Sequence, residues 1–252
     1  MKWLGCERIE LADCESTNDE AAALARTGAR HGTIVIARSQ RAGRGRGGRA
    51  WASPPGTGLY LSAVLRPALA IEDLPPITLA IGIGVCDAAR ACGAPAKLKW
   101  PNDVLANDKK LAGVLVEAQS HGGRLDAAIA GIGVNLTGEL PADVAAIAIT
   151  LDAAAGVAGA HDPFVELLLE HVERWIDRYV AHGISAILPA WTERMASGLA
   201  ARATIGGTAV IGEMLGLASD GALLLRDRDG RVHHVRSGDV EMIRNEHPPS
   251  PC

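Results

Sequence analysis

The feature that most restricts the fold of this 252-residue chain is a change of pattern after Gly198. From there on, short β-type runs alternate with glycine-containing turns, at residues 201–205, 209–218, 222–226 and 232–235. Pairs such as Asp220-Gly221 and Asp229-Gly230 are typical of tight hairpins. Strands of this length and spacing predict a small β-barrel of about 45 residues at the end of the chain.

The residues before Gly198 alternate β-rich runs with helical ones, which predicts a mixed α/β domain. Strands are expected at 8–11, 33–38, 58–66, 97–100, 104–105, 111–117 and 125–132, and helices at 17–26, 76–91, 163–181 and 185–195. Thr17 and Glu20 have the spacing of a capping box at the start of the first helix. The expected domains are residues 1–198 and 199–246, followed by a disordered tail at 247–252.

Composition and charge exclude several classes of protein. The formal net charge of −4 gives no global basic field for nucleic acid. The odd number of cysteines, without a C-x-x-C pair, favours reduced thiols in a cytoplasmic protein. No apolar run resembles a signal peptide, and the apolar stretch at 77–86 is too short to span a bilayer.

The most concentrated positive charge lies in a glycine-rich loop, QRAGRGRGGRAW at residues 40–51. Glycines expose backbone amides and let the chain approach a ligand closely. The four arginines supply forked donors for phosphate or carboxylate oxygens. This segment alone fits three interpretations: an anion-binding loop that closes over its ligand, a flexible surface loop, or an RNA contact.

Four other segments combine polar side chains with strand ends or a helix start: Ser16-Thr17-Asn18, Lys99-Trp100-Pro101-Asn102-Asp103, Lys110-Leu111-Ala112-Gly113 and Gly131-Ile132-Gly133-Val134-Asn135. A helix start presents free amides to an acceptor group. Asp103 is a candidate ligand for Mg²⁺ or a ribose, and Lys110 is a candidate partner for a phosphate or carboxylate. Taken one by one, they also fit ordinary caps, turns and bulges. The sequence has no catalytic triad order, no zinc-ligand spacing and no P-loop.

Taken together and in order, these segments resemble the biotin–protein ligase family. The resemblance also includes GLYLS at 58–62 and KLAGVLVE at 110–117, and it covers nearly the whole chain. It implies a catalytic α/β (α+β) domain like that of class II aminoacyl-tRNA synthetases, with a mixed sheet and flanking helices. The β-rich end stands where the family has an SH3-like barrel. The chain resembles the members without an N-terminal DNA-binding domain.

The resemblance also implies roles for individual residues. Contacts to biotin are expected from Ser16, Thr17, Asn18, Gln40, Gly43, Arg44, Tyr60, Ser62, Lys110 and Gly113. Nucleotide contacts are expected from Arg46, Arg49, Trp51, Asn102 and Asn135. Arg46 and Lys110 are expected to be catalytic, and Asp103 is a possible Mg²⁺ ligand. The loop departs from the common family form at Gly47 and Ala50, where basic residues often stand.

The implied activity is adenylation of biotin by ATP with Mg²⁺, followed by transfer of biotin to a lysine of a biotin carboxyl-carrier domain. Biotin and ATP would be substrates, with no tightly bound prosthetic group. No DNA, no membrane and a possible homodimer are expected. The alternatives are a lipoate or octanoate ligase on the same fold and, from another class, a nucleic-acid-binding protein that uses the glycine–arginine loop.

Overall fold

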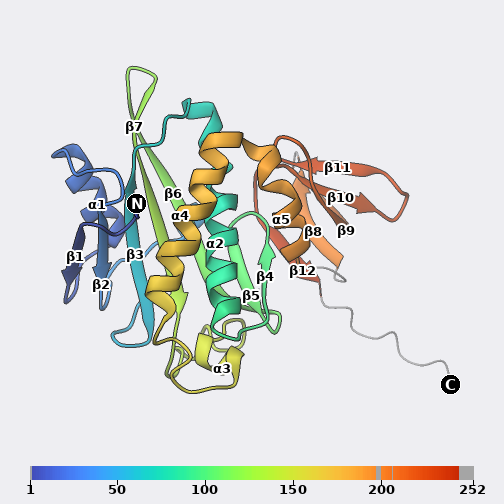
Figure 1. Cartoon of the computed structure of the whole chain (residues 1–252). Coiled ribbons are helices and arrows are strands. Elements are labelled where there is room, and N and C mark those ends of the chain that lie inside the picture. The colour runs from blue at the N-terminus through green and yellow to red at the C-terminus, as the bar shows by residue number, and fades with distance from the viewer. Residues whose placement is uncertain (1, 197–199, 206, 244–252) are drawn as a thin grey trace.

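The computed structural model describes residues 2–196, 200–205 and 207–243. A seven-stranded mixed sheet forms the centre of the larger part, in the order β1-β2-β3-β7-β6-β5-β4 (Figure 1). β1 pairs with β2 in parallel, and every other neighbouring pair is antiparallel. The expected tail at 247–252 and the expected boundary at Gly198 lie outside the described residues.

The strands of this sheet are β1 (Arg8–Leu11), β2 (Ile34–Ala37), β3 (Gly58–Leu65), β4 (Ala96–Lys99), β5 (Asp103–Ala106), β6 (Lys109–His121) and β7 (Arg124–Asn135). The helices are α1 (Thr17–Arg26), α2 (Ile77–Ala91), α3 (Leu151–Ala155), α4 (Phe164–His182) and α5 (Leu188–Arg194). Single 3₁₀ turns occur at Arg46–Gly48, Ile71–Asp73 and Ile184–Ala186. The strand and helix types expected from the sequence are confirmed, and α3 was not expected.

The two faces of the sheet carry different helices. Alternate residues of a strand face opposite sides, and Ile34 on β2 joins the large core beneath α2 and α4 while its neighbour Val35 packs with Ala21 and Ala25 of α1. Figure 1 shows α2 and α4 lying side by side across one face. The short helix α1 packs mainly on β2, β3 and β7 on the other face. Much of that second face is therefore left for loops and for a ligand.

One described helical stretch, Ile71–Ala91, is long and apolar enough to cross a membrane by length and composition. The sequence expectation that no segment is long enough is therefore wrong on length. Within that stretch, 67% of the apolar window is buried inside the protein. Burial against the sheet and α4 explains its hydropathy, because a helix that is apolar all round must be covered on all sides.

The C-terminal part is a five-stranded antiparallel sheet in the order β11-β10-β9-β8-β12. Its strands are β8 (Ala200–Ile205), β9 (Thr208–Leu217), β10 (Leu223–Asp227), β11 (Val232–Val235) and β12 (Val240–Ile243). The four expected strands are confirmed, and β12 was missed. This sheet is joined to the larger part at Trp100, whose indole N–H donates to the Gly221 carbonyl oxygen at 3.1 Å.

Two local expectations differ from the structure. Ser16, not Thr17, is the N-cap residue of α1, and the helix start has no side-chain capping bond. The expected Thr17–Glu20 capping box is therefore wrong, because the Thr17 hydroxyl is directed toward Gln40 and Ser62. β7 also continues through Gly131 to Asn135, so these glycines lie within a paired strand and not at a bulge.

Candidate active site

A cavity of about 880 Å³ opens on the sheet face that α1 leaves partly uncovered. Three glycines of β6 and β7 form its floor: Gly113, Gly131 and Gly133. A Cβ atom at Gly131 would collide with the Asn18 amide, and one at Gly133 would collide with the Trp51 ring. Gly131 and Gly133 are required because larger side chains would fill the space that Asn18 and Trp51 occupy.

One end of the cavity is lined mainly by uncharged polar side chains. Ser16, Thr17 and Asn18 line it at the start of α1, together with Gln40 from the glycine–arginine loop. Ser16, Thr17 and Asn18 are each no more than 5% exposed. Gln40 Oε1 accepts hydrogen bonds from the Thr17 backbone N–H at 2.8 Å and from its hydroxyl at 3.1 Å. This end suits a small head group that both donates and accepts hydrogen bonds.

Behind this polar end lies a second layer of hydrogen bonds. Ser62 on β3 is fully buried, and its Oγ lies 2.8 Å from Thr17 Oγ1 and 2.6 Å from Asn18 Oδ1. Asn18 Nδ2 donates to Glu117 Oε2 on β6 at 2.5 Å. Because both polar atoms of the Asn18 side chain have a partner, its amide is held in one orientation.

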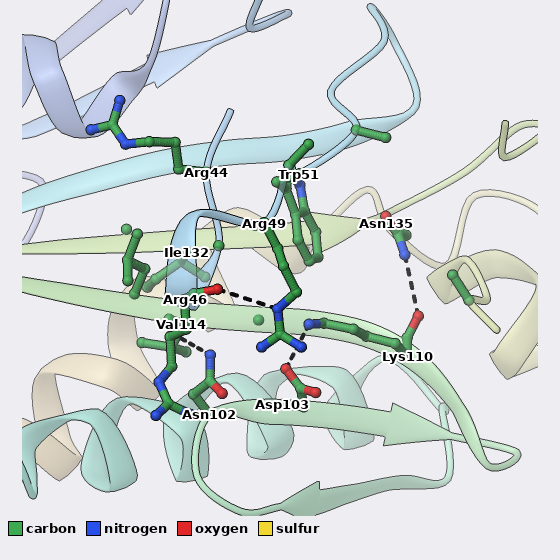
Figure 2. A pocket seen from close by; sticks show the side chains of 18 of the residues that line it. Arg44, Arg46, Arg49, Trp51, Asn102, Asp103, Lys110, Val114, Ile132 and Asn135 are labelled. Atoms are coloured by element: carbon green, nitrogen blue, oxygen red, sulfur yellow. Dashed lines mark hydrogen bonds and ion pairs between the residues drawn. The ribbon is translucent and has the colours of Figure 1, made fainter. Parts of the chain in front are cut away.

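The opposite end of the cavity is cationic. Figure 2 shows the ends of Arg49, Lys110 and Asp103 turned toward one another. Asp103 accepts from Lys110 Nζ at 2.6 Å and from Lys99 Nζ at 3.4 Å. The lining includes four cations, Lys99, Lys110, Arg46 and Arg49, and the carboxylates of Asp103, Asp108 and Glu241. The four clustered cations can bind a ligand with several negative charges.

The Trp51 ring separates the two ends of the cavity. It lies over Gly133 and Gly113 of the floor, and the Lys110 ammonium is 5.3 Å from its ring centroid. The indole Nε1 is buried without a hydrogen-bond partner, the one such side-chain atom in the described part of the chain. A flat aromatic ring beside clustered cations is suited to stacking against a nucleobase while the cations hold its phosphates.

A wall at residues 144–148 completes the cavity on the Lys110 side. It is fixed to the backbone of Lys110, whose N–H donates to the Ile147 oxygen at 2.8 Å and whose carbonyl accepts from Ile149 at 3.0 Å. Asn135 Nδ2 donates to the same Lys110 oxygen at 3.2 Å. The backbone position of Lys110 is thus fixed from two sides, whereas its side chain projects into the cavity.

The glycine–arginine loop is anchored at both ends of the cavity. Arg44 lines the cavity, but its guanidinium turns toward α1 (Figure 2) and forms a bidentate pair with Asp19 at 2.6 and 2.7 Å. The hydrogen bond from Arg44 lowers the pKa of Asp19 below its usual 3.8. At the other end, Arg49 pairs with Asp239 of the C-terminal part at 2.8 Å, and Arg46 donates to the Gly238 carbonyl at 3.4 Å.

The structure brings together most of the residues expected from the sequence. The cavity is lined by Ser16, Thr17, Asn18, Gln40, Arg44, Arg46, Arg49, Trp51, Tyr60, Asn102, Asp103, Lys110, Gly113 and Asn135. Gly43 and Ser62 do not line it. A Cβ at Gly43 would meet the Trp51 carbonyl and the Ser53 hydroxyl, so Gly43 allows close packing inside the loop.

Other residues of the site were not expected. Lys99 begins the KWPND segment and lines the cavity, and Glu117 ends the KLAGVLVE segment and holds Asn18. Both lay inside motifs that the sequence had already singled out. The wall at 144–148 and the contacts from Gly238 and Asp239 had no comparable signal, because they depend on tertiary packing.

Asp103 is the residue that the sequence offers for Mg²⁺. Its carboxylate is already paired with Lys99 and Lys110. Within the described ranges, no group of three or more His, Cys, Asp or Glu side chains is placed to hold a metal ion. Mg²⁺ normally takes one or two protein carboxylates, with water and phosphate oxygens completing its octahedron. The residues therefore do not fit a metal held by the protein alone.

Comparison with known proteins gives matches along most of the chain. The Biotin/lipoate A/B protein ligase family matches residues 13–135. A biotin–[acetyl-CoA-carboxylase] ligase of Paracoccus denitrificans is 37% identical over 229 residues, which are 88% of this chain and 95% of that protein. The bifunctional ligase/repressor BirA of Bacillus subtilis is 35% identical over 90% of this chain and 71% of its own length.

Solved structures agree with these relatives. The biotin protein ligase of Aquifex aeolicus in complex with biotin and ATP superimposes with a TM-score of 0.81 at 28% identity. The match covers 95% of this chain and 99% of the Aquifex chain. The likeness therefore extends over both sheets.

Proposed function

This chain belongs to the biotin protein ligase family, and from that membership we propose how its cavity carries out the reaction. The enzyme is an ATP-dependent ligase that adenylates biotin, releases pyrophosphate and transfers biotin to a lysine of a biotin carboxyl-carrier domain. The observation that carries the proposal is the two-ended cavity, with an uncharged polar end and a cationic end separated by Trp51.

Biotin occupies the polar end in this proposal. Its cyclic urea has two N–H donors and one carbonyl acceptor, which match the hydroxyls and amides of Ser16, Thr17, Asn18 and Gln40. The buried Tyr60 contributes its ring to the wall, because its hydroxyl already donates to the Pro54 carbonyl at 2.9 Å. The valeryl chain then runs over Gly113 toward the cations.

ATP occupies the cationic end, with its base near Trp51 and Asn135. The biotin carboxylate attacks the α-phosphorus, a mixed anhydride forms, and pyrophosphate leaves. Both reactants are anions, so Arg46 and Lys110 offset their repulsion and the charge that develops in the transition state. Arg49 and Lys99 hold the remaining phosphate oxygens. Catalysis consists of positioning and charge stabilisation, since the described cavity supplies no activated nucleophile.

In the second step the neutral amine of the acceptor lysine attacks the acyl carbon of the adenylate, and AMP leaves with the electron pair of the broken C–O bond. The new amide nitrogen gives up one proton to the leaving AMP phosphate or to water. When AMP leaves, its phosphate carries away the negative charge that Arg46 and Lys110 stabilised. Mg²⁺ bound to the phosphates of ATP would offset part of their negative charge, and Asp103 is the residue that could contribute a ligand to it. Asp103 keeps the two lysine ammonium groups in place before the nucleotide binds.

Several finer features belong to the same proposal. The first domain, residues 1–198, has the class II synthetase type of fold, and the second, at 199–246, is the SH3-like unit.

The chain acts in the cytoplasm on a protein acceptor and does not bind DNA, and the net charge of −4 supports the absence of DNA binding. A gel shift with DNA at about micromolar affinity and physiological salt would contradict this. A homodimer stays a prediction that size-exclusion chromatography can test.

The deciding experiment is pyrophosphate–ATP exchange. We expect exchange that depends on biotin and is not supported by lipoate or octanoate at the same concentration. Addition of a biotin carrier domain should then give a product that streptavidin detects and that carries biotin on one lysine. Exchange that runs equally well with lipoate would assign the chain to the other branch of the family.

A further inference from the structure

Glu117 is a charged residue next to the polar end, and the reaction described above gives it no task. It extends from β6 toward α1, and its side chain is 44% exposed. Its Oε2 accepts from Asn18 Nδ2 at 2.5 Å and lies 3.9 Å from the Arg44 guanidinium. Glu117 does not line the cavity, whereas Asn18 does. Glu117 can therefore act on a ligand only through its neighbours Asn18 and Arg44, and Asn18 is the one with which it forms a hydrogen bond.

The carboxylate of Glu117 fixes which way the Asn18 amide points. An ionised carboxylate only accepts hydrogen bonds, so the NH₂ group of Asn18 must face it. The amide oxygen then faces Ser62, whose Oγ is 2.6 Å away. Since that oxygen cannot donate, Ser62 gives its single hydrogen to Asn18. The bare backbone of Gly131 leaves room for the amide in this position.

The Trp51 carbonyl is a second group that can only accept, and it fixes the direction of the hydrogen bonds that reach Thr17 through Ser53 and Gln40. The Trp51 carbonyl accepts from the Ser53 hydroxyl at 3.1 Å, so Ser53 must in turn accept from Gln40 Nε2 at 2.9 Å. The Gln40 amide is thereby oriented with Oε1 toward α1. This oxygen accepts from the Thr17 backbone N–H at 2.8 Å.

The Thr17 hydroxyl lies between the hydrogen bonds that start at Glu117 and those that start at the Trp51 carbonyl. Its Oγ1 is 2.8 Å from Ser62 Oγ and 3.1 Å from Gln40 Oε1. Neither neighbour has a hydrogen to give, because Ser62 has donated to Asn18 and Gln40 Oε1 is a carbonyl oxygen. The Thr17 hydroxyl must donate to one of them. The Thr17 oxygen then receives no hydrogen bond from either neighbour, so its lone pairs are left as acceptors at the polar end of the cavity.

We infer that Glu117 is a positioning residue for recognition of the ligand head group. By fixing the direction of the hydrogen bonds through Asn18 and Ser62, it makes Thr17 an acceptor for an N–H group of a cyclic urea. A dithiolane ring or a plain alkyl chain has no N–H to offer such an acceptor. The inference rests on the proposed function and adds a specificity residue to it.

The test uses two substitutions of Glu117. Glu117→Met removes the acceptor and keeps the length of the side chain, whereas Glu117→Gln keeps an oxygen that accepts from Asn18. Titration calorimetry without ATP should show biotin binding about tenfold weaker in Glu117→Met and within about threefold of wild type in Glu117→Gln. Desthiobiotin, which keeps the cyclic urea, should lose affinity by the same factor. The KM for ATP should stay unchanged in both variants.

Gln119→Met is the matched control. Gln119 lies two residues further along β6, and its side chain also reaches α1, by donating to the Ala22 carbonyl at 3.0 Å, but it does not line the cavity. It should leave the Kd for biotin unchanged. Unchanged biotin binding in Glu117→Met would overturn the inference, and so would equal weakening of biotin and ATP. Wild-type protein without biotin-dependent exchange would instead refute the reaction.

Discussion

Lys110 illustrates what a single side chain contributes at this site. Its backbone is fixed by the wall at 144–148, and its ammonium reaches Asp103 at 2.6 Å and the face of Trp51 at 5.3 Å. The side chain is 35% exposed, so it adds little to the core. A phosphate that binds at this end would therefore replace Asp103 as the partner of the Lys110 ammonium.

We predict that Lys110→Ala lowers the rate of biotin-dependent pyrophosphate exchange by roughly 10²–10³-fold, by analogy with the loss of one donor from an oxyanion hole. The melting temperature should change little, because no core contact is lost. Lys109→Ala is the matched control, since the Lys109 ammonium donates to the Ala145 carbonyl at 3.3 Å and does not line the cavity. Wild-type exchange in Lys110→Ala would remove this lysine from the reaction.

At the same scale, the sequence indicated which residues gather but not which of them touch the ligand. Tyr60 and Ser62 are two residues apart on β3 and therefore share a face of the sheet. Tyr60 lines the cavity, whereas Ser62 lies beneath Thr17 and Asn18. Strand periodicity predicts the shared face. Where α1 crosses that face is decided by packing, which no local pattern records.

At the scale of elements, the glycine–arginine loop is tied to the C-terminal part before any ligand binds. Asp239 lies 2.8 Å from Arg49 and 3.8 Å from Arg46. The arginines that we propose to hold the phosphates are therefore already paired with a carboxylate, and an entering nucleotide replaces Asp239 as their partner. The loop should be only partly ordered by this contact, because exposed ion pairs contribute little.

We predict that Asp239→Asn makes the loop more accessible to trypsin in the absence of ligands, by about two- to fivefold in cleavage rate at Arg46 and Arg49. The factor follows from the modest free energy of exposed ion pairs and from cleavage that tracks the open population. With biotin and ATP at about 100 times their dissociation constants, linkage of roughly 2.7 kcal/mol should protect the loop in both proteins.

The control for this experiment is Asp220→Asn, which breaks a pair with Arg236 that also belongs to the C-terminal part. It should leave cleavage of the loop as in wild type. Equal cleavage of wild type and Asp239→Asn without ligands would show that the contact does not restrain the loop.

Element types were predictable from the sequence because apolar periodicity and turn residues mark them directly. The type I′-like turn at Asn107 and Asp108, both with positive φ, joins β5 and β6 where the polar turn was expected. β12 was missed because Val240–Ile243 is short and contains a charged residue, so only its pairing with β8 identifies it. Pairing across the chain is a tertiary property.

At the scale of the whole molecule, the change of pattern after Gly198 marks a new sheet but not a separate core. Buried residues of the C-terminal part, such as Met214 and Leu223, belong to the same apolar cluster as Trp100 and Trp191. The sequence could predict two kinds of architecture in one chain. It could not predict that they share a continuous interior, which places Gly238 and Asp239 over the active-site loop.

The N-terminal segment is held against the rest of the protein by contacts that depend on pH. The Trp3 ring stacks on His31 at 4.0 Å between ring centroids, and its indole N–H donates to Asp177 of α4 at 3.0 Å. His31 Nδ1 accepts the backbone N–H of Arg66 at 2.9 Å. A protonated Nδ1 cannot accept this bond, so the segment is best packed when His31 is neutral.

The last prediction follows from the sign of that effect. Burial lowers the pKa of His31 below its usual 6.5, against the opposing charges of Asp177 and Glu173. The unfolded chain therefore binds the proton first, so His31 contributes its full stability above the unfolded pKa and loses it as pH falls toward the folded one. Burial also lowers the pKa of His171, which changes the stability in the same direction.

We expect the melting temperature to fall between about pH 7.5 and about pH 5.5. The fall should be smaller in His31→Asn, whose amide oxygen can still accept from Arg66. His234→Asn, on an exposed position of β11, should keep the full wild-type decrease. A decrease that is equally large in His31→Asn would mean that the N-terminal contact does not respond to this proton.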